Sequence, residues 1–253
     1  MKDDAPQQKS SRHVITRVSC PSTQDIIREE AMLGAPAGTV AITDHQTQGR
    51  GRRGRSWTAP AGKALMFSYL ARPRRPLAEL GTLSLVIGIV LCENLPIASH
   101  VRWPNDLVAD GGKVAGVLVE LITPREGDPF AIVGIGINAN ITREELPETD
   151  RLPATSLLLI SGCEIDRGAL FERVVNALDT ALALFDLEGF AAFRSRHEMV
   201  DGLRGNLLVL RLPSHDITGT AEGVDVSGRL ILRLPDGGSV AFAAGEIERV
   251  IDP

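Results

Sequence analysis

The sequence has little of what marks exported, membrane-spanning or metal-dependent proteins. Its three cysteines form no CxxC pair, and its five histidines show no ligand spacing such as HExxH. Separated cysteines without an export signal indicate a reducing cytoplasm and free thiols, so we expect no structural metal. The longest apolar run, Leu83–Cys92, is about half of what a bilayer crossing needs, which predicts a buried helix and no membrane span.

The charge balance and the missing catalytic motifs narrow the function further. The formal net charge is −5, which argues against wholesale nucleic-acid binding. There is no Walker A loop and no G-x-S-x-G elbow, and spacing nominates no Ser–His–Asp or Cys–His set. We therefore expect the ligands to carry the reacting groups, while the protein supplies position and positive charge.

The composition and the hydrophobic pattern divide the chain into three segments. Residues 1–12 are polar and of mixed charge, which predicts a disordered tail. Residues 13–200 alternate strand and helix patterns, including helices that start at Ser22 or Thr23 and after Asp166. Residues 201–253 hold about five short β runs between turns, which is typical of an SH3-like barrel. We predict an α+β fold: a mixed β-sheet with helices mainly on one face, then the barrel.

One stretch, Gly49–Trp57 (GRGRRGRSW), concentrates positive charge in this acidic chain. Its glycines let the backbone approach a ligand and expose N–H groups, and guanidinium forks bind phosphate or carboxylate. A solvated loop or an RGG-like RNA contact are the alternatives. RGG segments usually lie in disordered tails, whereas this loop joins two predicted strands. The context favours a clamp for a small anionic ligand.

Two further segments could contribute residues to a ligand site near this loop. Lys113 follows a predicted hairpin turn, Asp110-Gly111-Gly112, and would by default be a solvated surface charge. Asp106 precedes the same hairpin, so the fold could bring the carboxylate and the ammonium into one pocket. The GIGIN segment, Gly134–Asn138, has no third glycine and no following helix, so it is not a dinucleotide fingerprint. Glycines inside a strand indicate that a ligand or a helix lies close to the sheet.

Taken together, these segments resemble the biotin protein ligase family. The resemblance runs in order from about residue 13 to the C-terminus. It is carried by STQ at Ser22–Gln24, GRGRRGRSW at Gly49–Trp57, RWPND at Arg102–Asp106, KVAGVLVE at Lys113–Glu120, GIGIN at Gly134–Asn138 and PATSL at Pro153–Leu157.

The resemblance implies a class II synthetase-like catalytic domain and a two-step reaction. Biotin and Mg-ATP give biotinyl-5′-AMP and pyrophosphate, and a lysine of a biotin carboxyl carrier domain then takes the biotin. The Mg²⁺ accompanies ATP, and the protein is expected to hold no metal of its own. The resemblance leaves open whether the protein is a monomer or a homodimer. Because only about a dozen polar residues precede the catalytic region, we expect no N-terminal DNA-binding domain and no DNA partner.

The resemblance also implies roles for individual residues. Lys113, Arg50 and Asp106 are the expected catalytic residues. Biotin is expected to contact Ser22, Thr23, Gln46, Gly49, Arg50, Lys113, Gly116, Gly134 and Gly136. The nucleotide is expected to contact Arg52, Arg53, Arg55, Trp57, Asn105, Asn138 and Ser156.

Two departures from the family pattern, Gln24 and Arg102, stand where asparagine and lysine are usual. Gln24 keeps a polar amide, and Arg102 keeps the charge but not the geometry. Two rival functions remain at this point. A lipoate–protein ligase shares the adenylation logic but would need another substrate tunnel. A nucleic-acid-binding protein would use the arginine loop, although the chain offers no basic recognition helix.

Overall fold

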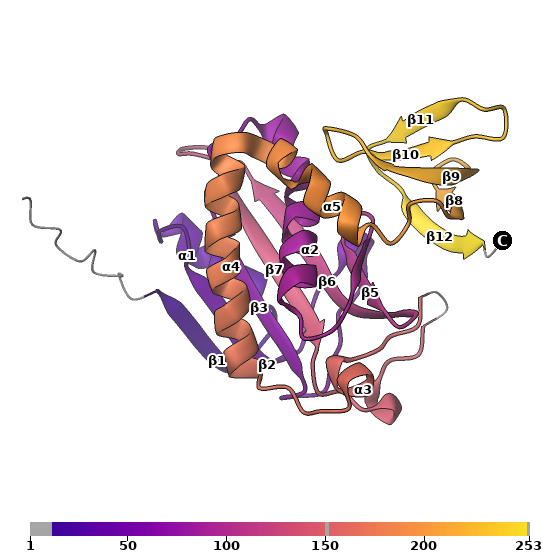
Figure 1. Cartoon of the computed structure of the whole chain (residues 1–253). Helices are drawn as coiled ribbons and strands as arrows, with labels where there is room; N and C mark the ends of the chain where they lie inside the picture. Colours follow the sequence, from indigo (N-terminus) through magenta and orange to yellow (C-terminus); the bar gives the residue numbers. More distant parts are fainter. Residues whose placement is uncertain (1–11, 150–151, 252–253) are drawn as a thin grey trace, which may run out of the picture.

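The computed structural model describes residues 12–149 and 152–251, which form two β-sheets with helices packed on the larger one (Figure 1). The larger sheet has seven strands in the order β1-β2-β3-β7-β6-β5-β4, and the smaller has five in the order β11-β10-β9-β8-β12. Apart from Arg12, the predicted tail 1–12 lies outside the described residues. In the larger sheet β1 and β2 are parallel and the other neighbours are antiparallel, so the sheet is mixed, as predicted.

The elements follow one another along the chain as the sequence predicted, with a few additions. The strands of the larger sheet are β1 (Val14–Cys20), β2 (Val40–Gln46), β3 (Ala64–Ala71), β4 (His100–Arg102), β5 (Asp106–Ala109), β6 (Gly112–Ile122) and β7 (Phe130–Asn138). The helices are α1 (Thr23–Met32), α2 (Leu83–Asn94), α3 (Leu157–Ser161), α4 (Arg167–Glu188) and α5 (Arg194–Val200). The smaller sheet contains β8 (Leu207–Arg211), β9 (Asp216–Val224), β10 (Leu230–Arg233), β11 (Ser239–Phe242) and β12 (Glu246–Ile251).

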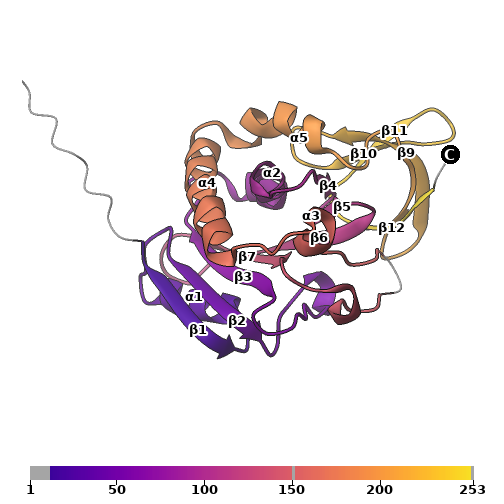
Figure 2. The same cartoon turned by 60° about the horizontal axis from the view of Figure 1, so that its bottom comes forward.

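Helices α2, α4 and α5 cover one face of the larger sheet, while α1 lies on the other (Figure 2). The strands alternate accordingly, because successive side chains point to opposite faces. In β3, Tyr69 and Ala71 join the large core under α2 and α4, whereas Leu70 packs with Ile27 of α1. Helices mainly on one face, an α+β class and a small C-terminal β unit were all predicted, and this fold class is confirmed.

Helix α2 is almost entirely apolar and lies in the core of the molecule. The stretch Leu77–Asn94 is long and apolar enough to cross a membrane by composition alone, but 56% of it is buried inside the molecule. Its residues Val86, Ile87 and Val90 are almost completely buried in the core that also holds α4. The prediction of a buried helix is confirmed.

Local signals at element ends explain several boundaries. Ser22 caps α1 by accepting a hydrogen bond from the Gln24 amide, and Asp166 caps α4 in the same way. Between β5 and β6 the turn residues Asp110 and Gly111 have positive φ angles of 48° and 71°. Such a two-residue turn suits the twist of a hairpin, and it fixes which residues of β5 and β6 face each other.

The smaller sheet is fastened to the β4–β5 edge of the larger one. The Trp103 indole nitrogen donates to the Gly228 carbonyl at 3.0 Å, and Arg102 Nη2 donates to the Ile247 carbonyl at 3.1 Å. Burial lowers the pKa of the Arg102 guanidinium, and the nearby Asp106 carboxylate opposes that effect. Arg102 therefore joins the two sheets, and the start of β12 comes close to the arginine loop.

Candidate active site

The arginine loop Gly49–Trp57 folds back on itself as a narrow hairpin. The Trp57 amide donates to the Gly49 carbonyl at 2.9 Å, and the Gly51 amide donates to the Arg55 carbonyl at 2.7 Å. A Cβ atom on Gly49 would lie 2.3 Å from the Trp57 carbonyl oxygen, so only glycine fits at the base of the loop. At its tip Arg53 adopts a left-handed conformation, with φ of 56°. The loop therefore has the shape of a tight hairpin.

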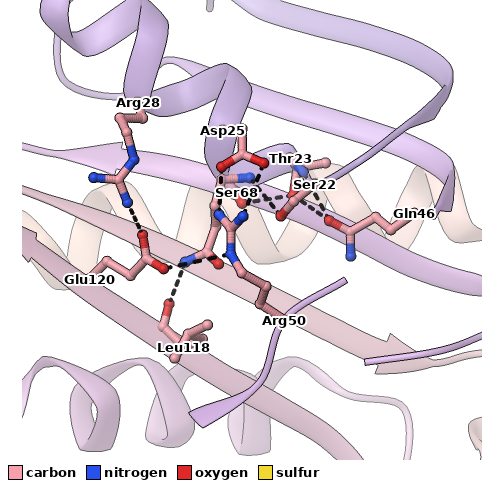
Figure 3. Close-up of polar contacts among 10 residues, drawn as sticks. Ser22, Thr23, Asp25, Arg28, Gln46, Arg50, Ser68, Leu118 and Glu120 are labelled. Atoms are coloured by element: carbon pink, nitrogen blue, oxygen red, sulfur yellow. Dashed lines mark hydrogen bonds and ion pairs between the residues drawn. The ribbon is translucent and has the colours of Figure 1, made fainter. Parts of the chain in front are cut away.

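A first cavity, of about 110 Å³, lies on the α1 face of the sheet between α1, the arginine loop and strands β3, β6 and β7. One end of it is polar. The Thr23 amide and hydroxyl both donate to Gln46 Oε1, at 2.9 and 3.2 Å, and the Thr23 hydroxyl lies 2.7 Å from that of Ser68 (Figure 3). Ser22 also lines this end. Clustered hydroxyl and amide groups suit a ligand with a polar head group.

The glycines of β6 and β7 make room for protein side chains. A Cβ atom on Gly136 would lie 2.5 Å from the Trp57 indole, and one on Gly116 would lie 3.2 Å from that indole and from Lys113 Nζ. A Cβ atom on Gly134 would meet the Gln24 side chain at 3.0 Å. We expected these glycines to let a ligand lie against the sheet. In the structure the indole and the amide cover them, and a ligand would lie beside these two groups.

A second cavity, of about 430 Å³, adjoins the first on the side of the smaller sheet. Both cavities are lined by Arg52, Arg55, Ser56, Trp57, Asn105, Asp106 and Lys113. In this shared wall Lys113 Nζ lies 2.6 Å from Asp106 Oδ1 and 5.6 Å from the centre of the Trp57 ring. The predicted meeting of Lys113 with Asp106 is confirmed by this distance. An ammonium at such a junction can stabilise two anions that meet there.

The four arginines of the loop have different partners. Arg50 binds Asp25 with both Nη atoms, at 3.0 and 2.8 Å, and Arg53 and Arg55 form ion pairs with Glu246 of β12. Arg52 donates instead to the amide oxygen of Asn105 at 3.2 Å.

These environments act on the pKa values in opposite directions. The hydrogen bonds that Arg50 donates to the Asp25 carboxylate raise the pKa of Arg50, whereas burial lowers the pKa of Arg52. Arg52 lines both cavities and donates to an uncharged oxygen, so its charge can serve an anionic ligand.

Two residues expected near the nucleotide hold the protein together. Asn138 donates its amide to the Thr155 carbonyl at 2.9 Å, although it also lines the second cavity. Ser156 is completely buried, caps α3 by accepting from the Leu159 amide, and donates to the Ile141 carbonyl. It lies outside the lining of both cavities, so this geometry gives Ser156 a structural role.

Sequence reasoning missed four polar residues that shape the site: Ser68, Asp25, Glu120 and Glu246. Ser68 had a signal, because it is the one small polar residue in the apolar strand ALMFSYLA and a buried polar group needs a partner. The three carboxylates had none, since an isolated acidic residue is usually a solvated surface charge.

Matches to two family models place this chain in a class of ligases. Residues 15–140 match the model of the Biotin/lipoate A/B protein ligase family, and residues 209–250 match that of the biotin protein ligase C-terminal domain.

Relatives and solved structures narrow the class to one family. A biotin–[acetyl-CoA-carboxylase] ligase of Mycobacterium tuberculosis is 32% identical, covering 89% of this chain and 85% of that protein. The bifunctional ligase/repressor BirA of Escherichia coli is 39% identical, covering 83% of this chain and 66% of its own length. The biotin protein ligase of Aquifex aeolicus, solved in complex with biotin and ATP, superimposes with a TM-score of 0.77 at 32% identity over 93% of this chain and 97% of that one. This chain belongs to the biotin protein ligase family, as the sequence motifs predicted.

Proposed function

We propose that this chain activates biotin with ATP and transfers it to a lysine of a biotin carboxyl carrier domain. The observation that carries the proposal is the shared wall of the two cavities, where Lys113 and Asp106 form an ion pair at 2.6 Å. A carboxylate from the first cavity and a phosphate from the second would meet beside this pair. The Aquifex aeolicus relative, in complex with biotin and ATP, supports the two-substrate interpretation.

In the first step a biotin carboxylate oxygen attacks the α-phosphorus of ATP and pyrophosphate leaves, which gives biotinyl-5′-AMP. Two anions must approach each other, so Lys113 and Arg52 contribute by holding positive charge at the meeting point. Magnesium is proposed as part of the nucleotide substrate, held mainly by phosphate oxygens and water, as is usual for this ion.

In the second step the acceptor amine attacks the acyl carbon, an amide forms and AMP leaves. The amine must lose a proton, and Asp106 in the shared wall is placed to accept it. We assign the polar end of the first cavity, with Ser22, Thr23 and Gln46, to the biotin head group. The second cavity is assigned to the nucleotide.

Pyrophosphate exchange tests this function. Purified protein should exchange labelled pyrophosphate into ATP only when biotin is present. Exchange that is equally fast without biotin, or that lipoate alone supports, would refute the assignment and favour the rival ligase. A nucleic-acid-binding role is disfavoured because Arg50, Arg53 and Arg55 are already paired with carboxylates of the same chain.

The names of the relatives support a carboxylase carrier as the acceptor partner. Which carboxylase carries the lysine is a question for biotin transfer assays with purified carrier domains. A monomer or homodimer, a cytoplasmic location, and the absence of DNA and membrane partners stay predictions from the sequence.

A further inference from the structure

A row of four alternating charges connects α1, β6 and the arginine loop (Figure 3), and one of its members, Arg50, lines the first cavity. Arg28 pairs with Glu120, Glu120 Oε1 lies 3.8 Å from Arg50 Nε, and Arg50 pairs with Asp25 at 2.8 and 3.0 Å. Asp25 and Arg28 belong to α1, Glu120 to β6, and Arg50 to the arginine loop. The row therefore connects three elements that each contribute lining residues to the first cavity.

The Arg50–Asp25 contact uses the full fork of the guanidinium. Both Nη atoms donate to different oxygens of one carboxylate, which is the geometry of strong charge-assisted pairs. Asp25 lies in the first turn of α1, where a negative charge is favoured by the exposed amides of the helix end. Arg50 lines the first cavity, and its guanidinium reaches Asp25, which is not among the lining residues (Figure 3).

Helix α1 is held to the sheet independently of this pair. Gln24 donates its side-chain amide to the Leu118 carbonyl of β6 at 3.3 Å and lies against Gly134. This second attachment fixes α1, and with it Asp25, on the sheet. Arg50 of the loop therefore binds a carboxylate whose position is already set. The side chains of the pair are 36% and 41% exposed, so breaking it costs the whole fold little.

We infer that Asp25 is a positioning residue for biotin recognition: by holding the Arg50 guanidinium it fixes the first limb of the arginine loop over the first cavity. Glu120 supports this by lying against the other side of the same guanidinium. The inference rests on the proposed function, since it takes biotin as the ligand of the first cavity. It assigns the Arg50 side chain to anchoring the loop, in place of the catalytic role predicted from the sequence.

The test is the variant Asp25→Asn, which removes the charge and keeps the size. It should raise the KM for biotin and its dissociation constant about three- to tenfold, the range of a partly exposed bidentate pair. The kcat of adenylate formation and the KM for ATP should change less than twofold, because Lys113 and Asp106 are untouched. Arg50→Lys, which keeps the charge but loses the fork, should behave like Asp25→Asn, and the double variant should be no worse than either single one.

Glu93→Gln is the matched control, because Glu93 accepts from two nitrogens of Arg196 in an exposed pair far from the cavity. It should leave the biotin KM unchanged. A biotin KM for Asp25→Asn equal to that of wild type or of Glu93→Gln, or a loss confined to kcat, would overturn the inference. Wild-type protein that binds no biotin would instead refute the proposed function, so the two failures are distinguishable.

Discussion

Lys113 Nζ lies 2.6 Å from Asp106 Oδ1 in the wall shared by two cavities, and the two residues come from the strands of one hairpin. The register pairs Val108 with Lys113 and Asp106 with Gly116, so both side chains are set by the same tight turn. A cation and a carboxylate held this way can serve successive steps: the cation while two anions meet, and the carboxylate while an amine loses its proton.

Replacing Lys113 should abolish most of the first step. Lys113→Ala removes the charge beside the reacting atoms, and we expect biotin-dependent pyrophosphate exchange to fall by about 100-fold or more. Lys113 lines the cavities and is not part of the hydrophobic core, so the variant should still fold, with a cooperative thermal unfolding transition. Single-turnover rates of adenylate formation equal to those of wild type would remove Lys113 from the mechanism.

Replacing Asp106 should separate the two steps. Asp106→Asn keeps the shape but cannot accept the amine proton, so transfer from preformed biotinyl-5′-AMP to a carrier domain should slow by about 100-fold. Adenylate formation should fall much less. The two rates are compared by quenched-flow assays of each half-reaction, and equal losses in both would contradict a role specific to transfer.

Adding one methyl group at Gly136 should disturb the first cavity. Its Cβ atom would lie 2.5 Å from the Trp57 indole, so the ring must move, at a cost of about 1–3 kcal/mol in the free energy of unfolding. Gly136→Ala should also weaken biotin binding. Gly81→Ala is the control, because a Cβ atom there has no neighbour within 4 Å. Urea unfolding measures the stability of both variants, and calorimetric titration measures their affinity for biotin. Equal values for the two variants would contradict this prediction.

The contact between Glu246 and the loop should control how often the loop opens. Its carboxylate pairs with Arg53 and Arg55, and Glu246→Gln should raise the rate of tryptic cleavage after these arginines about two- to fivefold. Glu222→Gln, in the same sheet but paired with Arg233, should leave that rate unchanged. Equal cleavage of wild type and Glu246→Gln would show that the pair does not hold the loop.

His197 should make the fold less stable in mild acid. Burial lowers the pKa of this imidazole below its ordinary 6.5, although Asp201 at 4.0 Å opposes the effect. Below pH 6.5 the unfolded chain therefore binds a proton that the folded chain does not, so the free energy of unfolding falls as the pH drops towards the folded pKa. Urea titrations between pH 7.5 and 5 should show a smaller fall for His197→Gln, and equal falls would contradict this prediction.

Most of the fold could be predicted from local signals, whereas strand β1 and the short helices α3 and α5 were not predicted. Strand β1, VITRVSC, was not predicted because Arg17 and Ser19 interrupt its pattern and most of its side chains are exposed. It is an edge strand, paired on one side by β2 alone, so packing imposes little alternation on it. The helix caps, the Asp110-Gly111 turn and the apolar β7 run depend on residues that are neighbours in the sequence, and these features were predicted.

The candidate site likewise contains contacts that could be predicted from the sequence and contacts that could not. Lys113 and Asp106 belong to one hairpin, so their meeting followed from a short turn. The pairs Arg50–Asp25 and Arg53–Glu246 join residues 25 and 193 positions apart. Contacts of that range depend on how the sheets and the loop pack, and no pattern in the sequence around a single carboxylate identifies its partner.

The chain has two tryptophans. Trp57 lies between the two cavities, and Trp103 lies where the two sheets meet. The Trp57 indole is in the wall between the cavities, and its ring nitrogen is buried without a hydrogen-bond partner among the described residues. The Trp103 indole is bonded to Gly228, where the two sheets meet. The molecule thus carries two intrinsic fluorophores: the emission of one reports on the filling of the cavities, and that of the other on the docking of the smaller sheet.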